Sequence, residues 1–349
     1  MMRSLPFQIK LEIFLPILLV ILLCWALLNS GMQDDFLRTN HFFRSGDFVA
    51  FVLLGNFAHN FFFLWQMARM PEFQDWARNY RFYGLSIYVI LPVLFLLLWA
   101  IFGLGLGITR VMPRKSLDSD VFNWVLLFIA LVNGHHSLSQ SRGLSFSYAH
   151  NVSNTAPASE LERSHVIERW MTRLLFVSEA VYMLFFLVIL SRPSTFGENA
   201  ARFLFVASVL VVGIGLLLWT STRLGVLKSA FAVRYIPRAF LGFSPLPTYF
   251  TYALHGLEST LLTWRMIGRS RAQRLGWLKL EFLLLFAGLG LLYIYVYRPL
   301  GGALKDSEWA TPVRSGFVAF AVTHYISEGF FYRFRNQHTR KFIAPLMKP

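Results

Sequence analysis

Stretches of about 20 apolar residues recur along the whole chain, and they constrain its fold more than any other feature of the sequence. An α-helix needs about 20 predominantly apolar residues to cross the hydrocarbon core of a bilayer. Nine segments approach this requirement: 11–29, 47–68, 84–109, 121–141, 173–191, 202–221, 248–267, 277–297 and 313–333. The sequence therefore predicts an all-α fold, a polytopic transmembrane helical bundle of eight to nine spans.

The composition agrees with this class of protein. Of the 349 residues, 56% are hydrophobic and 15% are charged, whereas about a quarter of the residues in a soluble domain are charged. The apolar segments follow one another without a soluble block long enough to fold separately. We therefore expect a single integral-membrane domain over residues 1–349.

The net charge of +15 comes from short basic clusters at the ends of apolar segments, such as Arg69–Arg81 and Arg265–Arg274. This placement is typical of the positive-inside rule for membrane proteins. No basic stripe with interleaved aromatic residues is present, so the charge does not indicate a nucleic-acid partner. We expect a protein of the bacterial inner (cytoplasmic) membrane, with the lipid bilayer as its main partner.

The topology of residues 222–247 stays open at the level of sequence. The spans 202–221 and 248–267 are both followed by basic residues, so both are expected to end on the cytoplasmic side. Two consecutive spans can do so only if 229–247 returns the chain across the membrane. Eight spans, and nine or more, therefore remain as alternatives.

Four of the predicted spans carry histidines, two of them together with carboxylates. Ionisable residues inside a span are costly to bury, and each one is therefore a candidate functional residue. The residues in question are His59, His135, His136, His255, Glu258, His324, Tyr325 and Glu328.

Their spacing predicts that they converge. Residues three or four apart share one face of a helix, which pairs His255 with Glu258 and His324 with Glu328. Each of the four spans also has a histidine six to ten residues before an arginine at its end. At 1.5 Å per residue, these histidines lie at depths of about 9 to 15 Å from a basic boundary. If the four helices run in the same direction, the histidines form one layer.

The donor types predict a metal ion. Imidazole binds iron, copper and zinc, and carboxylates favour harder ions such as iron. The chain has one cysteine, Cys24, so no cluster of thiolates competes for the role of ligand. We expect one or two iron ions, and zinc as the next choice. The predicted ligands are His59, His135, His136, His255, Glu258, His324 and Glu328.

Three roles in the predicted site differ from that of a simple ligand. His135 and His136 point about 100° apart on a helix, and His136 is favoured because Asn133 and Gln140 share its face. Glu258 or Glu328 could act as a general base instead of a ligand. We expect Tyr325 to orient ligands or to take part in the reaction.

These motifs resemble, in general arrangement, the histidine-motif membrane oxygenases: desaturases, hydroxylases and carotenoid-modifying enzymes. The resemblance rests on Asn56-Phe-Ala-His59-Asn60, His135-His136-Ser-Leu-Ser-Gln140, His255-Gly-Leu-Glu258 and His324-Tyr-Ile-Ser-Glu328. The His-x3-His and His-x2-His-His motifs of that family are absent. The resemblance implies a non-haem iron site that acts on a lipid or isoprenoid with dioxygen.

The sequence thus favours a membrane metalloenzyme, an oxidoreductase for an apolar small molecule that enters from the bilayer. It contains no ferredoxin-like or flavin-binding segment, so electrons would come from an external donor. Two alternatives use the same histidines and carboxylates. They are a transporter with these groups as proton relays, and a haem-handling protein with the histidines as axial ligands. A third alternative is a scaffold in which His–Glu pairs only hold helices together.

Overall fold

The computed structural model describes residues 46–111, 246–297, 309–331 and 336–347, together with residue 15 and single positions between 132 and 177. Almost all of these residues are helical, which confirms the all-α class. The chain divides into two compact units. One comprises residues 57–136 and 263–347, and the other comprises 1–56, 137–262 and 348–349. We refer to them as the first and the second unit, and describe each one by itself.

Five long helices coincide with five of the predicted spans: α3 (Gly46–Arg69), α5 (Ile87–Val111), α11 (Leu246–Arg269), α12 (Leu275–Leu292) and α14 (Ala310–Phe331). α12 continues into a π-helical turn, η3 (Tyr293–Tyr297). The predicted span 202–221, and most of the spans 11–29, 121–141 and 173–191, lie outside the described residues. So do residues 222–245, where the topology was open.

Within the described part of the chain, two helices are both long and apolar enough to cross a membrane. They are Ile87–Leu104 of α5 and Leu275–Leu292 of α12. α3, α11 and α14 are similarly long but carry the polar residues discussed above. Two of the predicted spans thus have the length and composition of candidate membrane-spanning helices, and the number of spans stays a prediction.

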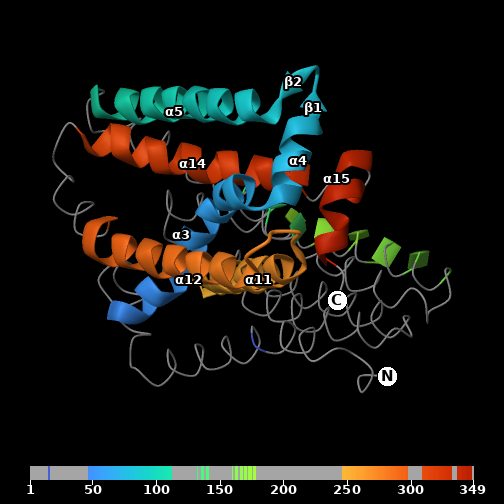
Figure 1. The fold of residues 1–349 in the computed structure, drawn as a ribbon. Coiled ribbons are helices and arrows are strands. Elements are labelled where there is room, and N and C mark those ends of the chain that lie inside the picture. The colour runs from blue at the N-terminus through green and yellow to red at the C-terminus, as the bar shows by residue number, and fades with distance from the viewer. Residues whose placement is uncertain are drawn as a thin grey trace. The chain divides into compact units, whose positions relative to one another are not determined.

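In the first unit, α14 lies beside α5, and residues 57–69 of α3 pack against both α14 and α12 (Figure 1). α5 and α14 meet around Phe102, Ala319 and Val322, which are all buried. A hydrogen bond from the Trp99 indole to the Pro312 carbonyl, 2.9 Å long, joins the same two helices. α3 contacts α12 through aromatic rings, and the ring centroids of Phe62 and Phe282 are 4.9 Å apart.

A small subdomain closes one end of the first unit. The amphipathic helix α4 (Pro71–Asn79) follows α3 directly, and two short antiparallel strands, β1 (Arg81–Phe82) and β2 (Leu85–Ser86), lead into α5. The C-terminal helices α15 (Gln337–Phe342) and η4 (Ala344–Met347) complete it. α15 packs on α4, where the buried indole of Trp76 donates to the Thr339 hydroxyl at 3.2 Å.

A buried carboxylate links α4 to the connection between α11 and α12. Glu72 is 4% exposed and accepts a 2.8 Å hydrogen bond from the Ser270 hydroxyl and another from the Arg271 amide. The Arg271 guanidinium also donates a hydrogen bond to the Asp75 carboxylate, and this hydrogen bond raises the pKa of Arg271 above its ordinary value. A further ion pair joins Arg69 at the end of α3 to Glu281 of α12. These contacts set where α3, α11 and α12 end relative to one another in this unit.

Candidate metal centre

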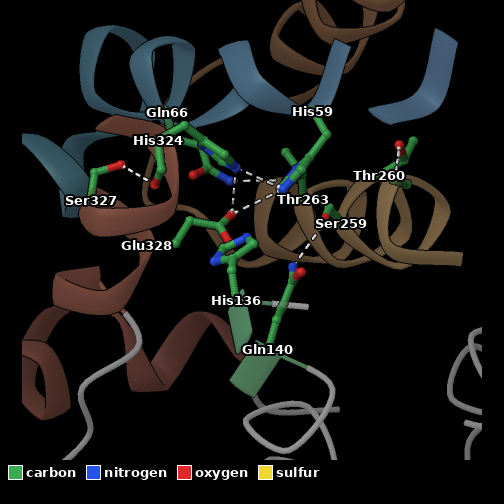
Figure 2. A network of polar contacts seen from close by, with 11 residues as sticks. His59, Gln66, His136, Gln140, Ser259, Thr260, Thr263, His324, Ser327 and Glu328 are labelled. Carbon is green, nitrogen blue, oxygen red and sulfur yellow. Dashed lines mark hydrogen bonds and ion pairs between the residues drawn. The ribbon is translucent and has the colours of Figure 1, made fainter. Parts of the chain in front are cut away.

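Three histidines and one glutamate converge in the interior of the first unit. His59 comes from α3, His324 and Glu328 come from α14, and His136 is in helical conformation. His59, His136 and His324 are 1%, 7% and 0% exposed, and Glu328 is 6% exposed. Each offers a ligand atom, and these atoms all lie within 4.8 Å of one another. Figure 2 shows the four side chains pointing toward a common centre.

Glu328 contacts all three imidazoles, but through different oxygens. Its Oε1 is 3.5 Å from Nε2 of His59 and 3.7 Å from Nε2 of His324, while its Oε2 is 3.2 Å from Nε2 of His136. The carboxylate therefore stands between a histidine pair on one side and a single histidine on the other.

The two histidines of the pair touch directly. Nε2 of His324 and Nε2 of His59 are 2.8 Å apart, a hydrogen-bonding distance, and the two rings are nearly perpendicular. The contact joins α3 to α14 across 265 positions of sequence. It also turns both Nε2 atoms inward, toward the carboxylate.

Aromatic side chains surround the four polar groups. Phe62 lies edge-on to His59 with 5.8 Å between ring centroids, and Phe63 is 5.3 Å from His324. Both phenylalanines are 2% exposed. Phe62 and Phe63 thus place buried apolar rings beside His59 and His324.

Tyr325 follows His324 in the sequence but acts on a different histidine. Its ring stacks on His136 with 4.4 Å between centroids and an angle of 22° between planes. This stacking holds the imidazole plane of His136 in one orientation. The sequence indicated Tyr325 as an orienting residue, and the structure identifies the ring that it contacts.

His135 does not join the centre. It is exposed, whereas His136 beside it is buried and contacts Glu328. The preference for His136 over His135, based on the shared face with Gln140, thus agrees with the geometry. His135 was among the predicted metal ligands, and its exposed position places it outside the group because adjacent side chains on a helix point in different directions.

His255 and Glu258 lie on the part of α11 that belongs to the second unit. Both are buried there, with exposed fractions of 2% and 5%. In the same unit, the amide of Gln140 donates a 2.6 Å hydrogen bond to the hydroxyl of Ser259. The roles of His255 and Glu258 as ligands stay predictions from their i, i+3 spacing.

One polar contact near the centre was not predicted. Gln66, two helical turns after His59 on α3, donates a 3.0 Å hydrogen bond to the hydroxyl of Thr263 on α11. Thr263 follows His255 by eight residues and Ser259 by four, so it continues the polar face of α11. That periodicity was a signal in the sequence that could have identified it.

Comparison with known proteins adds no relative to this description. No protein-family model, no curated protein and no solved structure matches the chain. The chemistry of the centre must therefore be argued from its own residues.

Proposed function

We propose that this chain is a membrane-embedded metalloenzyme, a non-haem iron oxidoreductase whose metal is held by His59, His136, His324 and Glu328. The observation that carries the proposal is the convergence of three imidazole nitrogens and one carboxylate in a buried, aromatic-lined site. The sequence-based prediction adds His255 and Glu258 as further ligands.

The distances between donors suit a single coordination sphere. Two donors bound to one ion at about 2.1 Å are about 3.0 Å apart at a right angle, about 3.4 Å apart in a tetrahedron, and about 4.2 Å apart on opposite sides. The separations of 3.2, 3.5 and 3.7 Å fall within this range, and the 2.8 Å between the nitrogens of His59 and His324 lies just below it. Because the ligand atoms all lie within 4.8 Å of one another, side-chain adjustment without movement of the helices could bring them onto one ion.

The burial of Glu328 favours a cation. Placing an ionised carboxylate in an apolar interior is costly unless an opposite charge or several hydrogen bonds compensate. A divalent ion between Glu328 and neutral imidazoles would supply that charge, and neutral imidazole is the form of histidine that ligates metals. The ion would also hold together helices that are far apart in sequence.

The donor set favours iron, with zinc as the next choice. Three imidazoles and a carboxylate without thiolates suit iron, and four donors leave coordination positions open on a six-coordinate ion. An ion held by these residues would supply redox chemistry or Lewis acidity. The two oxygens of Glu328 face different histidines, an arrangement that suits one ion or a carboxylate-bridged pair, and the metal-to-protein ratio distinguishes the two.

The exposed surface of α5 and α12 supports the membrane part of the proposal. Among the large hydrophobic side chains of α5 whose exposure is described, those more than half exposed are Val89, Val93, Leu96, Leu97, Ile101 and Leu104. On α12 and η3, exposed Leu283, Leu284 and Leu291 lie between Trp277 near one end and Tyr295 near the other. Aromatic residues at both ends of an apolar stretch are typical of helices that cross a bilayer. We accordingly infer a polytopic protein of eight to nine spans in a bacterial inner membrane.

The aromatic lining around the histidines favours an apolar substrate, such as a lipid or an isoprenoid that enters from the bilayer. Because the chain has no segment typical of a flavin or iron–sulfur protein, an external donor would deliver the electrons. Glu328 and Glu258 are the candidate general bases, and Tyr325 holds His136 in place. These assignments rest on the residue types and the contacts described above.

Elemental analysis tests the proposal directly. The full chain would be purified without chelators, and its iron and zinc contents would be compared with those of His59→Ala, His324→Ala and Glu328→Gln. We expect one or two metal ions per chain in the wild type and loss of most of this metal in each variant. Folded wild-type protein without stoichiometric metal would refute the metalloenzyme.

One observation favours a second function. The 2.8 Å contact between His59 and His324, continued by Glu328, is also the arrangement of a proton relay in a transporter. Purified, metal-free protein that acts as a relay would conduct protons across the membrane of lipid vesicles into which it is reconstituted. His324→Ala would abolish that conductance. The same contact disfavours haem bound between these two histidines, because axial ligands lie on opposite sides of a porphyrin.

A further inference from the structure

The closed end of the first unit carries a large excess of positive charge. Its segments 69–86, 269–281 and 337–347 contain nine Lys and Arg residues and three Asp and Glu residues. The three carboxylates are all engaged in ion pairs, Glu72 and Asp75 with Arg271 and Glu281 with Arg69. The excess therefore acts outward, on whatever contacts this end of the unit.

Four of the basic side chains stand on elements that pack together. Arg78 and Arg81 lie at the end of α4 and the start of β1, and Arg340 and Lys341 lie on α15. All four are exposed, and α15 packs against α4. Arg81 donates hydrogen bonds only to the backbone carbonyls of Arg78 and Tyr80 in the described contacts, so these bonds do not neutralise its charge. We call these four residues, Arg78, Arg81, Arg340 and Lys341, the basic end.

An apolar tip stands next to the basic end. The strands β1 and β2 are joined by Tyr83 and Gly84, whose φ angles of 50° and 80° produce a tight turn of the type that pairs short strands. The turn exposes Tyr83 to 91% and Leu85 beside it to 56%. The chain then enters α5, the most apolar of the described helices, at Ile87. Exposed tyrosine and leucine beside arginines are typical of the boundary between lipid and water.

We propose that the basic end binds the headgroups of anionic phospholipids, with Tyr83 and Leu85 inserted among the acyl chains beside them. The basic side chains complement a phosphodiester charge, and the hairpin supplies the apolar contact that a free phosphate in water would not need. A soluble acidic partner would match the charge but would leave Tyr83 and Leu85 without an apolar environment. The proposal rests on the membrane placement of the proposed function and not on its metal.

The expected effect follows from surface electrostatics. A basic side chain near an anionic bilayer surface contributes about 1 kcal/mol, which corresponds to about fivefold in affinity. Removing three such charges should therefore weaken binding of an anionic lipid by up to about a hundredfold. Binding of a zwitterionic lipid with the same acyl chains should change little.

The test measures binding of lipid to the purified, delipidated full chain in neutral detergent. Phosphatidylglycerol and phosphatidylcholine with identical acyl chains would be titrated, with native mass spectrometry and the thermal midpoint as readouts. The variants are Arg78→Gln/Arg340→Gln/Lys341→Gln, which leaves Arg81 in place because it contacts the end of α4, and Tyr83→Ser. Arg163→Gln, an exposed arginine of the second unit, is the matched control.

We expect the wild type and the control to bind phosphatidylglycerol at least tenfold more tightly than phosphatidylcholine, and the triple variant to lose this preference. Tyr83→Ser should weaken both lipids. The proposal would be overturned if the wild type bound the two lipids equally or if the triple variant kept its preference. It would also be overturned if inorganic phosphate raised the thermal midpoint as much as phosphatidylglycerol does. Metal content measured on the same samples should not differ between them, so a failure of the metal centre is recognised separately.

Discussion

The adjacent pair His135 and His136 offers the sharpest test of the metal centre, because the chain itself supplies the control. Both are histidines of one helical turn, but His136 is buried against Glu328 and His135 is exposed. Replacing either one by alanine removes the same imidazole from the same stretch of sequence. Only the replacement of His136 removes a donor from the centre.

The expected magnitude follows from the contacts of His136. Its Nε2 is one of three imidazole nitrogens in the group and lies 3.2 Å from Oε2 of Glu328. Loss of a residue that merely orients a ligand typically weakens metal binding by 10- to 100-fold. Loss of a ligand should cost at least the upper end of this range, about 100-fold or about 2.7 kcal/mol. His135→Ala should change the affinity by less than about threefold.

Competition with a chelator of known affinity measures this difference on purified full-length protein loaded with Fe(II) or Zn(II). The thermal midpoint of each metal-free variant shows whether the fold survives the substitution. Tyr325→Leu removes the ring that stacks on His136 but leaves the imidazole, and it therefore separates loss of stacking from loss of the nitrogen donor. Equal metal affinities for His136→Ala and His135→Ala, with both proteins folded, would refute the assignment of the centre.

Three further experiments test the packing within the first unit. Glu72→Gln replaces a buried carboxylate that accepts hydrogen bonds from the α11–α12 connection, and it should lower the free energy of unfolding by about 1–3 kcal/mol without changing the metal content. Gly316→Leu places a large side chain where a Cβ atom would already lie 3.5 Å from the Trp99 indole. This overpacking should lower the free energy of unfolding by about 1–3 kcal/mol. An unchanged thermal midpoint would contradict this contact. A double-mutant cycle of Gln66→Leu and Thr263→Val should give a coupling of about 1 kcal/mol, whereas strictly additive effects would show that their hydrogen bond is not formed.

The sequence predicts the long helices well because a run of about 20 apolar residues is easy to recognise. The predicted span 47–68 corresponds to α3 at Gly46–Arg69, and 248–267 corresponds to α11 at Leu246–Arg269. Runs of apolar residues ending at basic residues are sufficient to place such boundaries. The hairpin at Arg81–Ser86 was missed, since strands of two residues have no detectable alternation and Tyr83 adopts a positive φ that its residue type does not predict.

The convergence of the polar side chains was predictable only in part. The i, i+4 spacing of His324 and Glu328 indicates that they share a face, and the measured distance between them is 3.7 Å. Spacing within one helix cannot show which other helix approaches that face. The 2.8 Å contact with His59 depends on the packing of α3 against α14, which is determined by side chains such as Phe61 and Phe320.

The distance in sequence between the two touching histidines has a consequence for biosynthesis. His59 and His324 are 265 positions apart. At 5–20 residues per second, the ribosome adds the second histidine roughly 13 to 50 seconds after the first. During that interval no nascent chain has the complete set of donors, whatever the supply of metal. Loading of the proposed centre would then follow synthesis of α14, the helix that carries His324 and Glu328.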